Sequence, residues 1–331
     1  MPESPAPRAA TVIEVQDLVK TFPLSQGMFA AGGAVVHALS SVSFSVRAGE
    51  TLGIVGESGC GKTTLGKTLL RLYPADSGRI LLHGRDITQT GGSDLRALRR
   101  NIQMVFQDPF SSFNPRMSCG RIVAEPLEIH GIAKGAEKRD RVAAMFAQVG
   151  LRPEQMRRYP HQLSGGQRQR LGIARALALQ PEIIVADEPV SALDVSVQAQ
   201  VLNLMADLQR GSNLAFLFIS HDLAVVEHIA HRVAVMYLGR IVEIAEKRAL
   251  FAAPKHPYTE ALLAAVPVPR PGAKRERIIL RGDVPSPVNP PPGCAFHTRC
   301  PIAEPVCRER APELATVGAD HAVACHVRAA A

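Results

Sequence analysis

The sequence predicts an α/β fold, because short apolar strands alternate along the chain with helices of amphipathic spacing. Two observations carry this prediction. The first is a strand, a glycine-rich loop and a helix start in immediate succession over residues 50–72. The second is a set of apolar strands that end in polar or acidic side chains, as in open α/β sheets, where ligands bind beyond the carboxyl ends of the strands.

Composition limits the classes of protein that this chain can belong to. Its 331 residues allow one large domain or two moderate ones, and 46% hydrophobic and 21% charged residues are ordinary for a globular protein. The net charge of +8 suits a partner that carries phosphate, whether nucleotide, nucleic acid or lipid headgroup. No run approaches the roughly 18 apolar residues of a membrane span, and the first residues lack the apolar core of a signal peptide. We therefore expect a soluble, cytosolic protein with reduced thiols.

The glycine-rich loop matches the phosphate-binding pattern G-x-x-x-x-G-K-[ST] at every fixed position, with Gly56, Glu57, Ser58, Gly59, Cys60, Gly61, Lys62, Thr63 and Thr64. Backbone N–H groups of such a loop close round a phosphate, and the dipole of the following helix adds positive potential. Lys62 is expected to reach the β- and γ-phosphates, and the Thr63 hydroxyl to bind Mg²⁺. A glycine-rich turn that matches by chance is the alternative, which the strand before the loop and the helical spacing over 65–72 disfavour. The loop predicts a nucleoside triphosphate.

The elements around this loop are read from their periodicity. Strands are expected at 11–18 and 41–46, on either side of a surface loop from Ser25 to Ala34. Phe22 lies just before that loop, and it is either a purine-stacking aromatic or a core residue. After the phosphate-binding loop, a strand at 79–83, a helix at 94–100 and a strand at 102–106 lead to Gln107. This amide either satisfies backbone groups or contacts the metal and water near a γ-phosphate.

The middle of the chain is predicted to be helical from 126 to 159, with an amphipathic helix over 137–149. A glycine-containing helix start follows, and its residues are Ser164, Gly165, Gly166 and Gln167. Ser164 is a natural N-cap, and the glycines leave bare N–H groups at the helix start. Taken alone, this pattern favours a capped helix whose glycines permit close packing.

The next apolar strand, over residues 182–188, ends in Asp187 and Glu188. Two carboxylates at the tip of a buried strand indicate a cation or a substrate, and a solvated strand end is the alternative. Asp187 fits Mg²⁺ coordination, and Glu188 could orient or deprotonate an attacking water. A turn over 191–194 precedes a helix at 197–208, a buried strand at 214–219 leads to His221, and a hairpin covers 232–245. His221 could hydrogen-bond a γ-phosphate, and a structural histidine is the alternative, which its position at the end of a strand disfavours.

In this order, the motifs resemble those of the nucleotide-binding subunit of an ABC transporter over about residues 11–255. The resemblance implies a RecA-like core, an antiparallel β subdomain and an α-helical subdomain at about 110–165. By the same resemblance, Gln107 forms the Q-loop, residues 163–167 the signature, and His221 the switch histidine. Phe22 would stack on adenine and Asp194 would lie with the nucleotide-binding residues, while Asp187 would hold Mg²⁺ and Glu188 would act as the catalytic base. Two such chains would pair head to tail, with the Ser164 corner of one against the nucleotide of the other.

The segment after His256 narrows the resemblance to one group of ABC transporter ATPases. The sequence His-Pro-Tyr-Thr at 256–259 and the proline-rich run that ends at Cys294 resemble the ATPases of dipeptide and oligopeptide importers. Importers of nickel and glutathione share this type of C-terminal extension, here residues 256–331. The resemblance implies ATP-driven uptake through two separate transmembrane permease subunits, with a sibling ATPase and an extracytoplasmic substrate-binding protein. It also implies a peripheral position on the cytoplasmic face of the inner membrane and no nucleic-acid partner.

Four of the six cysteines, namely Cys294, Cys300, Cys307 and Cys325, lie in the last 38 residues with 5, 6 and 17 residues between them. Eleven prolines between 267 and 312 disfavour a regular fold there, so a metal is expected to hold the segment together. Zinc, a [4Fe–4S] cluster and unligated thiols are all compatible with the spacing, and the resemblance to peptide-importer ATPases favours the cluster. Cys60 is a candidate for oxidation that would impair nucleotide binding.

An alternative function is that of a soluble ABC ATPase acting on nucleic acid or ribosomes, which the basic net charge permits. Only about 100 residues separate the phosphate-binding loop from the signature, too few for the long coiled coils of the DNA-repair relatives. The chain also has one cassette rather than two, and it lacks interleaved aromatic and basic residues. These features favour the importer.

Overall fold

The computed structural model describes residues 10–24, 34–265, 280 and 282–329. They form two compact units: unit 1 contains residues 10–12, 46–51 and 89–219, and unit 2 contains the remaining described residues. Both units are discontinuous in sequence, and the domain ranges 11–255 and 256–331 stay a prediction. The surface loop expected from Ser25 lies outside the described residues, apart from Ala34. Within the described part of the chain, no helix is both long and apolar enough to cross a membrane.

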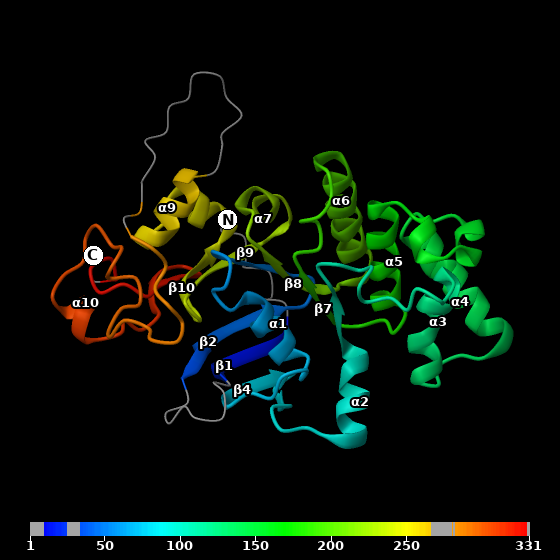
Figure 1. Cartoon of the computed structure of the whole chain (residues 1–331), viewed down its shortest axis with the longest axis horizontal. Coiled ribbons are helices and arrows are strands. Elements are labelled where there is room, and N and C mark those ends of the chain that lie inside the picture. Colours follow the sequence, from blue (N-terminus) through cyan, green and yellow to red (C-terminus); the bar gives the residue numbers. More distant parts are fainter. Residues whose placement is uncertain (1–9, 25–33, 266–279, 281, 330–331) are drawn as a thin grey trace, which may run out of the picture. The chain divides into compact units, whose positions relative to one another are not determined.

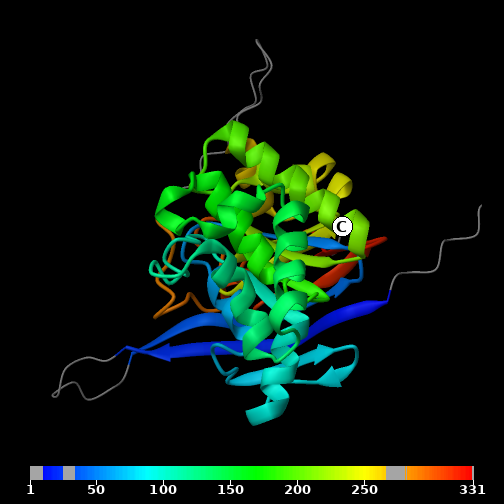
Figure 2. The ribbon, with the colours of Figure 1, turned by 90° about the vertical axis from the view of Figure 1, so that its right-hand side faces the viewer.

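Unit 2 contains, apart from the strand-end residues 11–12 and 46–47, an antiparallel sheet with the strand order β2-β1-β4-β5. Its strands are β1 (Thr11–Pro23), β2 (Val35–Arg47), β4 (Ser77–Leu82) and β5 (Arg85–Asp86). The alternating patterns at 11–18 and 41–46 predict the first two strands, which extend further than expected and run side by side in Figure 2. Ile13 lies opposite Leu82 in the register of β1 with β4. Because alternate side chains face one side, Ile13, Val15 and Leu18 are buried.

A second group of strands in unit 2 has the order β11-β12-β10-β9-β3. These strands are β3 (Thr51–Val55), β9 (Arg232–Tyr237), β10 (Arg240–Glu246), β11 (Ala315–Gly318) and β12 (His321–Val323). β3 and β9 are parallel, with Gly53 opposite Val233, and the hairpin of β9 and β10 confirms the sequence prediction. β11 and β12 were not expected, and β12 pairs with β10 through Glu243 and Val323.

Five helices belong to unit 2: α1 (Lys62–Leu69), α7 (Leu223–Ile229), α8 (Lys247–Ala252), α9 (Pro257–Ala265) and α10 (Val306–Glu309). A cluster of three aromatic side chains joins the C-terminal part of this unit to β9. The ring of Phe296 lies 5.3 Å from that of Tyr237 and 5.5 Å from that of Tyr258, and all three side chains are fully buried. Burial of large aromatic surface is a strong source of stability, so this cluster anchors the extension.

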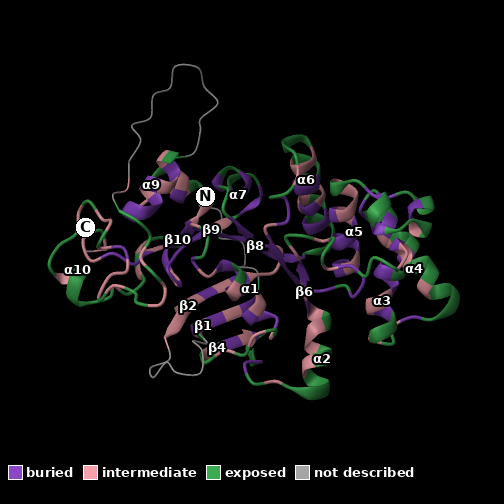
Figure 3. Cartoon of the chain, in the orientation of Figure 1, coloured by how far each residue is buried: buried purple, intermediate pink, exposed green. Residues whose placement is uncertain are grey.

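Unit 1 is built on three parallel strands in the order β8-β7-β6, which are β6 (Ile102–Val105), β7 (Ile183–Asp187) and β8 (Ala215–Ser220). Every residue of β7 and β8 is buried (Figure 3). Continuous apolar runs of this kind are typical of parallel strands that are covered on both faces. The parallel arrangement brings the carboxyl ends of β6 and β7, and therefore Gln107 and Glu188, to the same edge.

The helices of unit 1 are α2 (Gly92–Asn101), α3 (Cys119–Ile129), α4 (Gly135–Gln148), α5 (Gly165–Leu177) and α6 (Val195–Ser212). Two short 3-10 turns, η1 (Pro153–Arg157) and η2 (Pro160–Gln162), precede α5. Helices α3, α4 and α5 contact one another (Figure 1). Val142, Phe146 and Val149 are buried, which confirms the amphipathic stripe predicted for α4. Together the units show the alternation of helices and strands that the sequence predicts.

Candidate functional site

The phosphate-binding loop connects β3 to α1, as the sequence predicts. Gly61 has a φ of 105°, and a Cβ at this position would lie 2.2 Å from the backbone oxygen of Ala38. Only glycine meets both requirements, because a side chain would be strained by the backbone and would clash with β2. The loop is therefore held tightly against the strands of unit 2 before α1 begins at Lys62.

Lys62 is 5% exposed, and its ammonium group is turned onto the loop. Its Nζ donates to the backbone oxygens of Gly56, at 2.7 Å, and Glu57, at 2.9 Å. A phosphate at this position would compete with those two carbonyls for the donor protons of the ammonium group. Thr63 is exposed on the first turn of α1, where an oxygen donor can reach a metal beside the phosphates.

Phe22 is half-buried at the end of β1. In the structure it contacts a second aromatic side chain, which the sequence did not indicate. Its ring forms a T-shaped pair with that of Tyr73, with 5.2 Å between the ring centroids and 79° between the planes. The Lys20 ammonium group lies 5.2 Å from the centroid of Phe22. Phe22 is thus neither a buried core residue nor an isolated one, and stacking on adenine stays a prediction.

The two carboxylates after β7 have different environments. Asp187 is 4% exposed, and Glu188 is half-buried. Glu188 has a φ of 45°, in the left-handed region that non-glycine residues rarely adopt. Its N–H donates to the Ile219 oxygen at 2.9 Å, and the Gln107 Nε2 donates to its Oε2 at 2.9 Å. Strained backbone of this kind clusters at functional sites. The residue pattern did not indicate the left-handed conformation of Glu188.

The start of α5 has the cap that the sequence predicts. The Gln167 N–H donates to Ser164 Oγ at 3.4 Å, and the Ser164 N–H donates to Gln167 Oε1 at 3.1 Å, which completes a capping box. A Cβ at Gly166 would lie 2.4 Å from Val197 Cγ1 on α6, so this glycine is needed for close packing. The prediction that the glycines permit close packing is therefore confirmed for Gly166. Close packing does not exclude a role for the N–H groups of this helix start in nucleotide binding.

Three of the predicted motifs of unit 1 line one cavity of about 160 Å³. Gln107 and its neighbours line it together with Gly165 and the turn that contains Leu193. That turn ends at Asp194, whose Oδ1 accepts from the Val197 N–H at 3.0 Å and from the Ser196 hydroxyl at 2.8 Å. These hydrogen bonds lower the pKa of Asp194. Asp194 is thus the N-cap of α6, and its place among the nucleotide-binding residues stays a prediction.

His221 is exposed and follows β8 directly, before Asp222 caps α7. It belongs to unit 2 with Lys62 and Thr63, whereas Gln107, Ser164 and the two strand-end carboxylates belong to unit 1. The structure therefore joins Gln107 to Glu188 within one unit. The convergence of all these residues on one nucleotide stays a prediction.

Sequence reasoning missed two residues that contact the phosphate-binding loop. Tyr258 and Arg299, both from the C-terminal part of unit 2, hydrogen-bond to Glu57. The loop motif could not reveal them, because they lie about 200 and 240 positions along the chain from Glu57.

The structure gives no support to the metal predicted at the four C-terminal cysteines. Within the described residues, which include all four thiols, no group of three or more His, Cys, Asp or Glu side chains is arranged to hold a metal ion. Burial raises the pKa of Cys294 to about 11, and the thiols of Cys307, Cys300 and Cys325 contribute in the same direction. Other contacts that hold the segment are the aromatic cluster, the pairing of β12 with β10, and the hydrogen bond from the Cys294 N–H to the Cys307 oxygen at 2.8 Å, and the metal stays a prediction.

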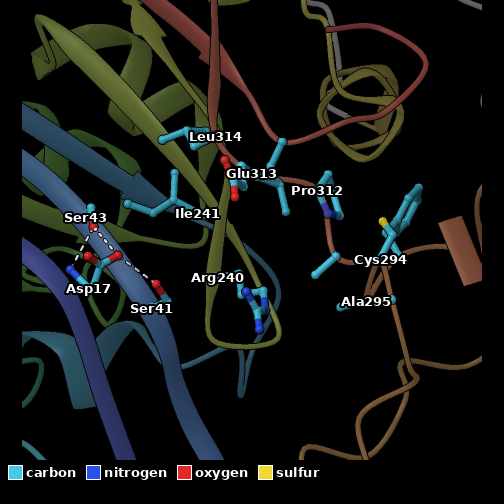
Figure 4. Close-up of a pocket in the computed structure, with 15 residues that line it drawn as sticks. Asp17, Ser41, Ser43, Arg240, Ile241, Cys294, Ala295, Pro312, Glu313 and Leu314 are labelled. Carbon is cyan, nitrogen blue, oxygen red and sulfur yellow. Dashed lines mark hydrogen bonds between the residues drawn. The ribbon is translucent and has the colours of Figure 1, made fainter. Parts of the chain in front are cut away.

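Cys294 lines a hollow of about 570 Å³ (Figure 4). Asp17, which accepts hydrogen bonds from the hydroxyls of Ser41 and Ser43, lines it from β1, and Arg240 lines it from the start of β10. No residue of the phosphate-binding loop lines this hollow, so it is not the predicted nucleotide site.

The expected sensitivity of Cys60 to oxidation is also unsupported. Its thiol is 5% exposed, and burial raises its pKa. Reactive cysteines are exposed and have lowered pKa values, because the thiolate is the nucleophile. Cys60 therefore has the environment of a small packing residue.

His256 gives a prediction for the pH dependence of stability. It is 2% exposed, and burial lowers its pKa from 6.5 to about 3, so the folded protein holds it neutral while the unfolded chain protonates it. Because the unfolded state then binds more protons, the free energy of unfolding should fall as the pH is lowered from about 6.5 toward about 3. His256→Asn removes the titration and keeps an acceptor for the Tyr258 N–H, so it should flatten this decline, by about 1.4 kcal/mol per pH unit at most.

Denaturant unfolding at several pH values measures the effect. His83→Asn, at an exposed position, is the control and should follow the original chain. Parallel curves for His256→Asn and the original chain would show that His256 does not titrate differently in the two states.

Comparisons with known proteins agree with this geometry. A family model described as "ABC transporter" matches residues 39–191, and one described as "Oligopeptide/dipeptide transporter, C-terminal region" matches residues 242–307. The oligopeptide transport ATP-binding protein AppF of Bacillus subtilis is 55% identical over 96% of this chain and 97% of its own length. A probable peptide ABC transporter ATP-binding protein of Sinorhizobium fredii, y4tS, is 57% identical over 97% of this chain and 91% of its own length.

A solved structure supports the fold. The post-hydrolysis dimer of the ATP-binding cassette MJ0796, bound to ADP and phosphate, aligns with a TM-score of 0.63 at 27% identity, covering 71% of this chain and 99% of that one. The α/β fold predicted from the sequence is thus that of an ABC-type ATPase, an enzyme that hydrolyses ATP. The similarity to the two relatives covers nearly the whole chain and therefore includes the segment after the ATPase domain. The chain belongs to the oligopeptide/dipeptide family of ABC transporter ATP-binding subunits. The relatives do not favour the nucleic-acid alternative.

Proposed function

We propose that this chain is the ATP-hydrolysing subunit of an importer that takes up dipeptides or oligopeptides through membrane subunits on other chains. The observation that carries this proposal is the joining, on one chain, of an ABC transporter match at 39–191 to an oligopeptide/dipeptide C-terminal match at 242–307. The names of the relatives from Bacillus and Sinorhizobium support the same substrate class.

The loop from Gly56 to Thr64 would bind the phosphates of ATP, with Lys62 on the β- and γ-phosphates. A triphosphate would replace the Gly56 and Glu57 carbonyls as partner of the Lys62 ammonium group. Phe22 would stack on the adenine ring. Thr63, Asp187 and Gln107 would hold Mg²⁺, whose preference for oxygen ligands suits a hydroxyl, a carboxylate and an amide. The ion supplies charge compensation for the phosphates.

Glu188 would accept a proton from the attacking water, and His221 would hydrogen-bond the γ-phosphate. Gln107, which already donates to Glu188, would orient that carboxylate toward the water. Ser164, Gly165, Gly166 and Gln167 of a neighbouring ATPase subunit would complete the site through the N–H groups of the two glycines, because those of Ser164 and Gln167 are bonded within the capping box, and Asp194 would lie beside it. Fixed donors that exclude water from a charged transition state lower its free energy more than the same groups do in solution.

The partners follow from the family. The neighbouring ATPase would be a sibling subunit, and two permease subunits and an extracytoplasmic substrate-binding protein would complete the importer. The chain would then lie at the cytoplasmic face of the inner membrane without crossing it. Nickel and glutathione are the alternative solutes, because their importers share this type of C-terminal extension.

Reconstitution of the native complex into vesicles tests the proposal. The complex is isolated through this chain, its members are identified, and ATP hydrolysis is measured with a dipeptide, an oligopeptide, nickel ions or glutathione supplied with the binding protein. We expect a dipeptide or an oligopeptide to stimulate hydrolysis and to accumulate in the vesicles. Stimulation by nickel or glutathione alone would overturn the substrate class, and a complex without permease subunits would overturn the importer.

A further inference from the structure

The phosphate-binding loop is held by two residues that lie far from it in the sequence. The Glu57 N–H donates to the Tyr258 hydroxyl oxygen at 3.0 Å. The Arg299 guanidinium donates from Nη1 to Glu57 Oε2 at 3.1 Å and from Nη2 to Oε1 at 3.4 Å. The Arg299 side chain is 9% exposed and that of Glu57 29%, so water screens this ion pair less than it screens a pair on the surface. Glu57 is thus fixed through both its backbone and its side chain.

Tyr258 is itself rigidly placed by a series of hydrogen bonds that begins on β10. The Glu243 carboxylate is fully buried and accepts from the Lys255 N–H at 2.7 Å and the His256 N–H at 2.9 Å. The Nδ1 atom of His256 accepts in turn from the Tyr258 N–H at 3.1 Å. Burial raises the pKa of Tyr258, so its hydroxyl stays a neutral acceptor for the Glu57 N–H.

Arg299 is placed by the aromatic cluster. Phe296, three residues earlier, packs against Tyr237 and Tyr258, and the N–H of Cys294, two residues before Phe296, donates to the Cys307 oxygen. The Arg299 N–H donates to the Phe296 oxygen at 3.0 Å, which closes the turn that carries the guanidinium toward the loop. The C-terminal extension therefore reaches the phosphate-binding loop through well-packed, hydrogen-bonded residues of the same unit.

A loop that binds a triphosphate needs these contacts for two reasons, the charge of Glu57 and the conformational entropy of the loop. The Glu57 carboxylate is negative, and like charges that are brought close together repel each other unless a cation compensates them. A loop that already has its bound shape also loses less conformational entropy when the ligand arrives. We propose that Tyr258 and Arg299, here called the loop brace, are positioning residues that hold the phosphate-binding loop ready for ATP and neutralise Glu57. This inference rests on the proposed binding of phosphates at the loop.

The affinity of the full-length chain for ATP with Mg²⁺, measured by calorimetry, tests the loop brace. Arg299→Ala should weaken binding about tenfold, and Tyr258→Phe, which removes one neutral hydrogen bond, about threefold. In hydrolysis assays the KM for ATP should rise by similar factors while kcat at saturating ATP changes little, because the brace lies on the loop and not on the residues assigned to the attacking water. Arg328→Ala is the matched control, since Arg328 pairs with Glu260 in the same extension at 3.4 Å but is 43% exposed. It should bind ATP as the original chain does.

A second substitution separates positioning from simple support of the fold. If Arg299 acts by neutralising Glu57, the double variant Glu57→Ala with Arg299→Ala should bind ATP more tightly than Arg299→Ala alone. If Arg299 only holds the extension together, the double variant should be as weak or weaker, and that result would overturn the proposal. Equal affinity of Arg299→Ala, Tyr258→Phe and the original chain would also overturn it. Failure of the original chain to bind ATP would instead refute the proposed function.

Discussion

Glu188→Gln is expected to reduce steady-state ATP hydrolysis by a factor of about 100 to 10,000, the range that general base catalysis contributes. The substitution keeps the size of the side chain, and it leaves the backbone bonds of this residue to Ile219 and Ser191 in place. Glutamine cannot accept the proton of the attacking water. ATP should therefore bind normally and remain intact.

The consequence for assembly is measurable. If two chains close over ATP, the Glu188→Gln variant should accumulate as a dimer in light scattering with ATP and Mg²⁺, whereas the original chain should return to monomers as it hydrolyses ATP. Glu227→Gln, an exposed carboxylate on α7, is the control and should hydrolyse ATP at the original rate. Rapid turnover by Glu188→Gln would show that another group activates the water.

Lys62→Ala is expected to weaken ATP binding by about 10- to 100-fold, because it removes the charge-assisted hydrogen bonds of a buried lysine. Lys62 is 5% exposed and its ammonium group bonds to two carbonyls of the loop, so its loss removes a donor from each, although the Glu57 oxygen still accepts from the Cys60 N–H at 3.3 Å. Calorimetry with ATP measures the affinity, and thermal unfolding shows whether the loop still folds.

The control for charge is Lys247→Ala, on α8 of the same unit. It removes the same charge from the chain and should leave the affinity for ATP unchanged. Equal losses in the two variants would mean that net charge, and not the position of Lys62, attracts the triphosphate.

The difference between predicted and observed structure is clearest in the C-terminal extension. Its prolines suggested a segment without regular structure, yet β12 pairs with β10 and Phe296 fills an aromatic core. Proline content describes local backbone preference, whereas β12 is stabilised by a strand that precedes it by about 80 residues. Long-range pairing of this kind has no local signal, so the sequence pattern could not indicate it.

Local chemistry determined much of this protein in the sequence itself. Three features are specified by a few neighbouring residues each. They are the apolar run of β7 with two acids at its end, the glycines before Lys62, and the Ser164 cap with Gln167. The tertiary structure alone decided the left-handed backbone of Glu188, and it alone brought Tyr258 and Arg299 to Glu57. The physical reason is separation along the chain: a turn, a cap or a buried strand is specified by nearby residues, whereas a contact across 200 residues exists only once the core has packed.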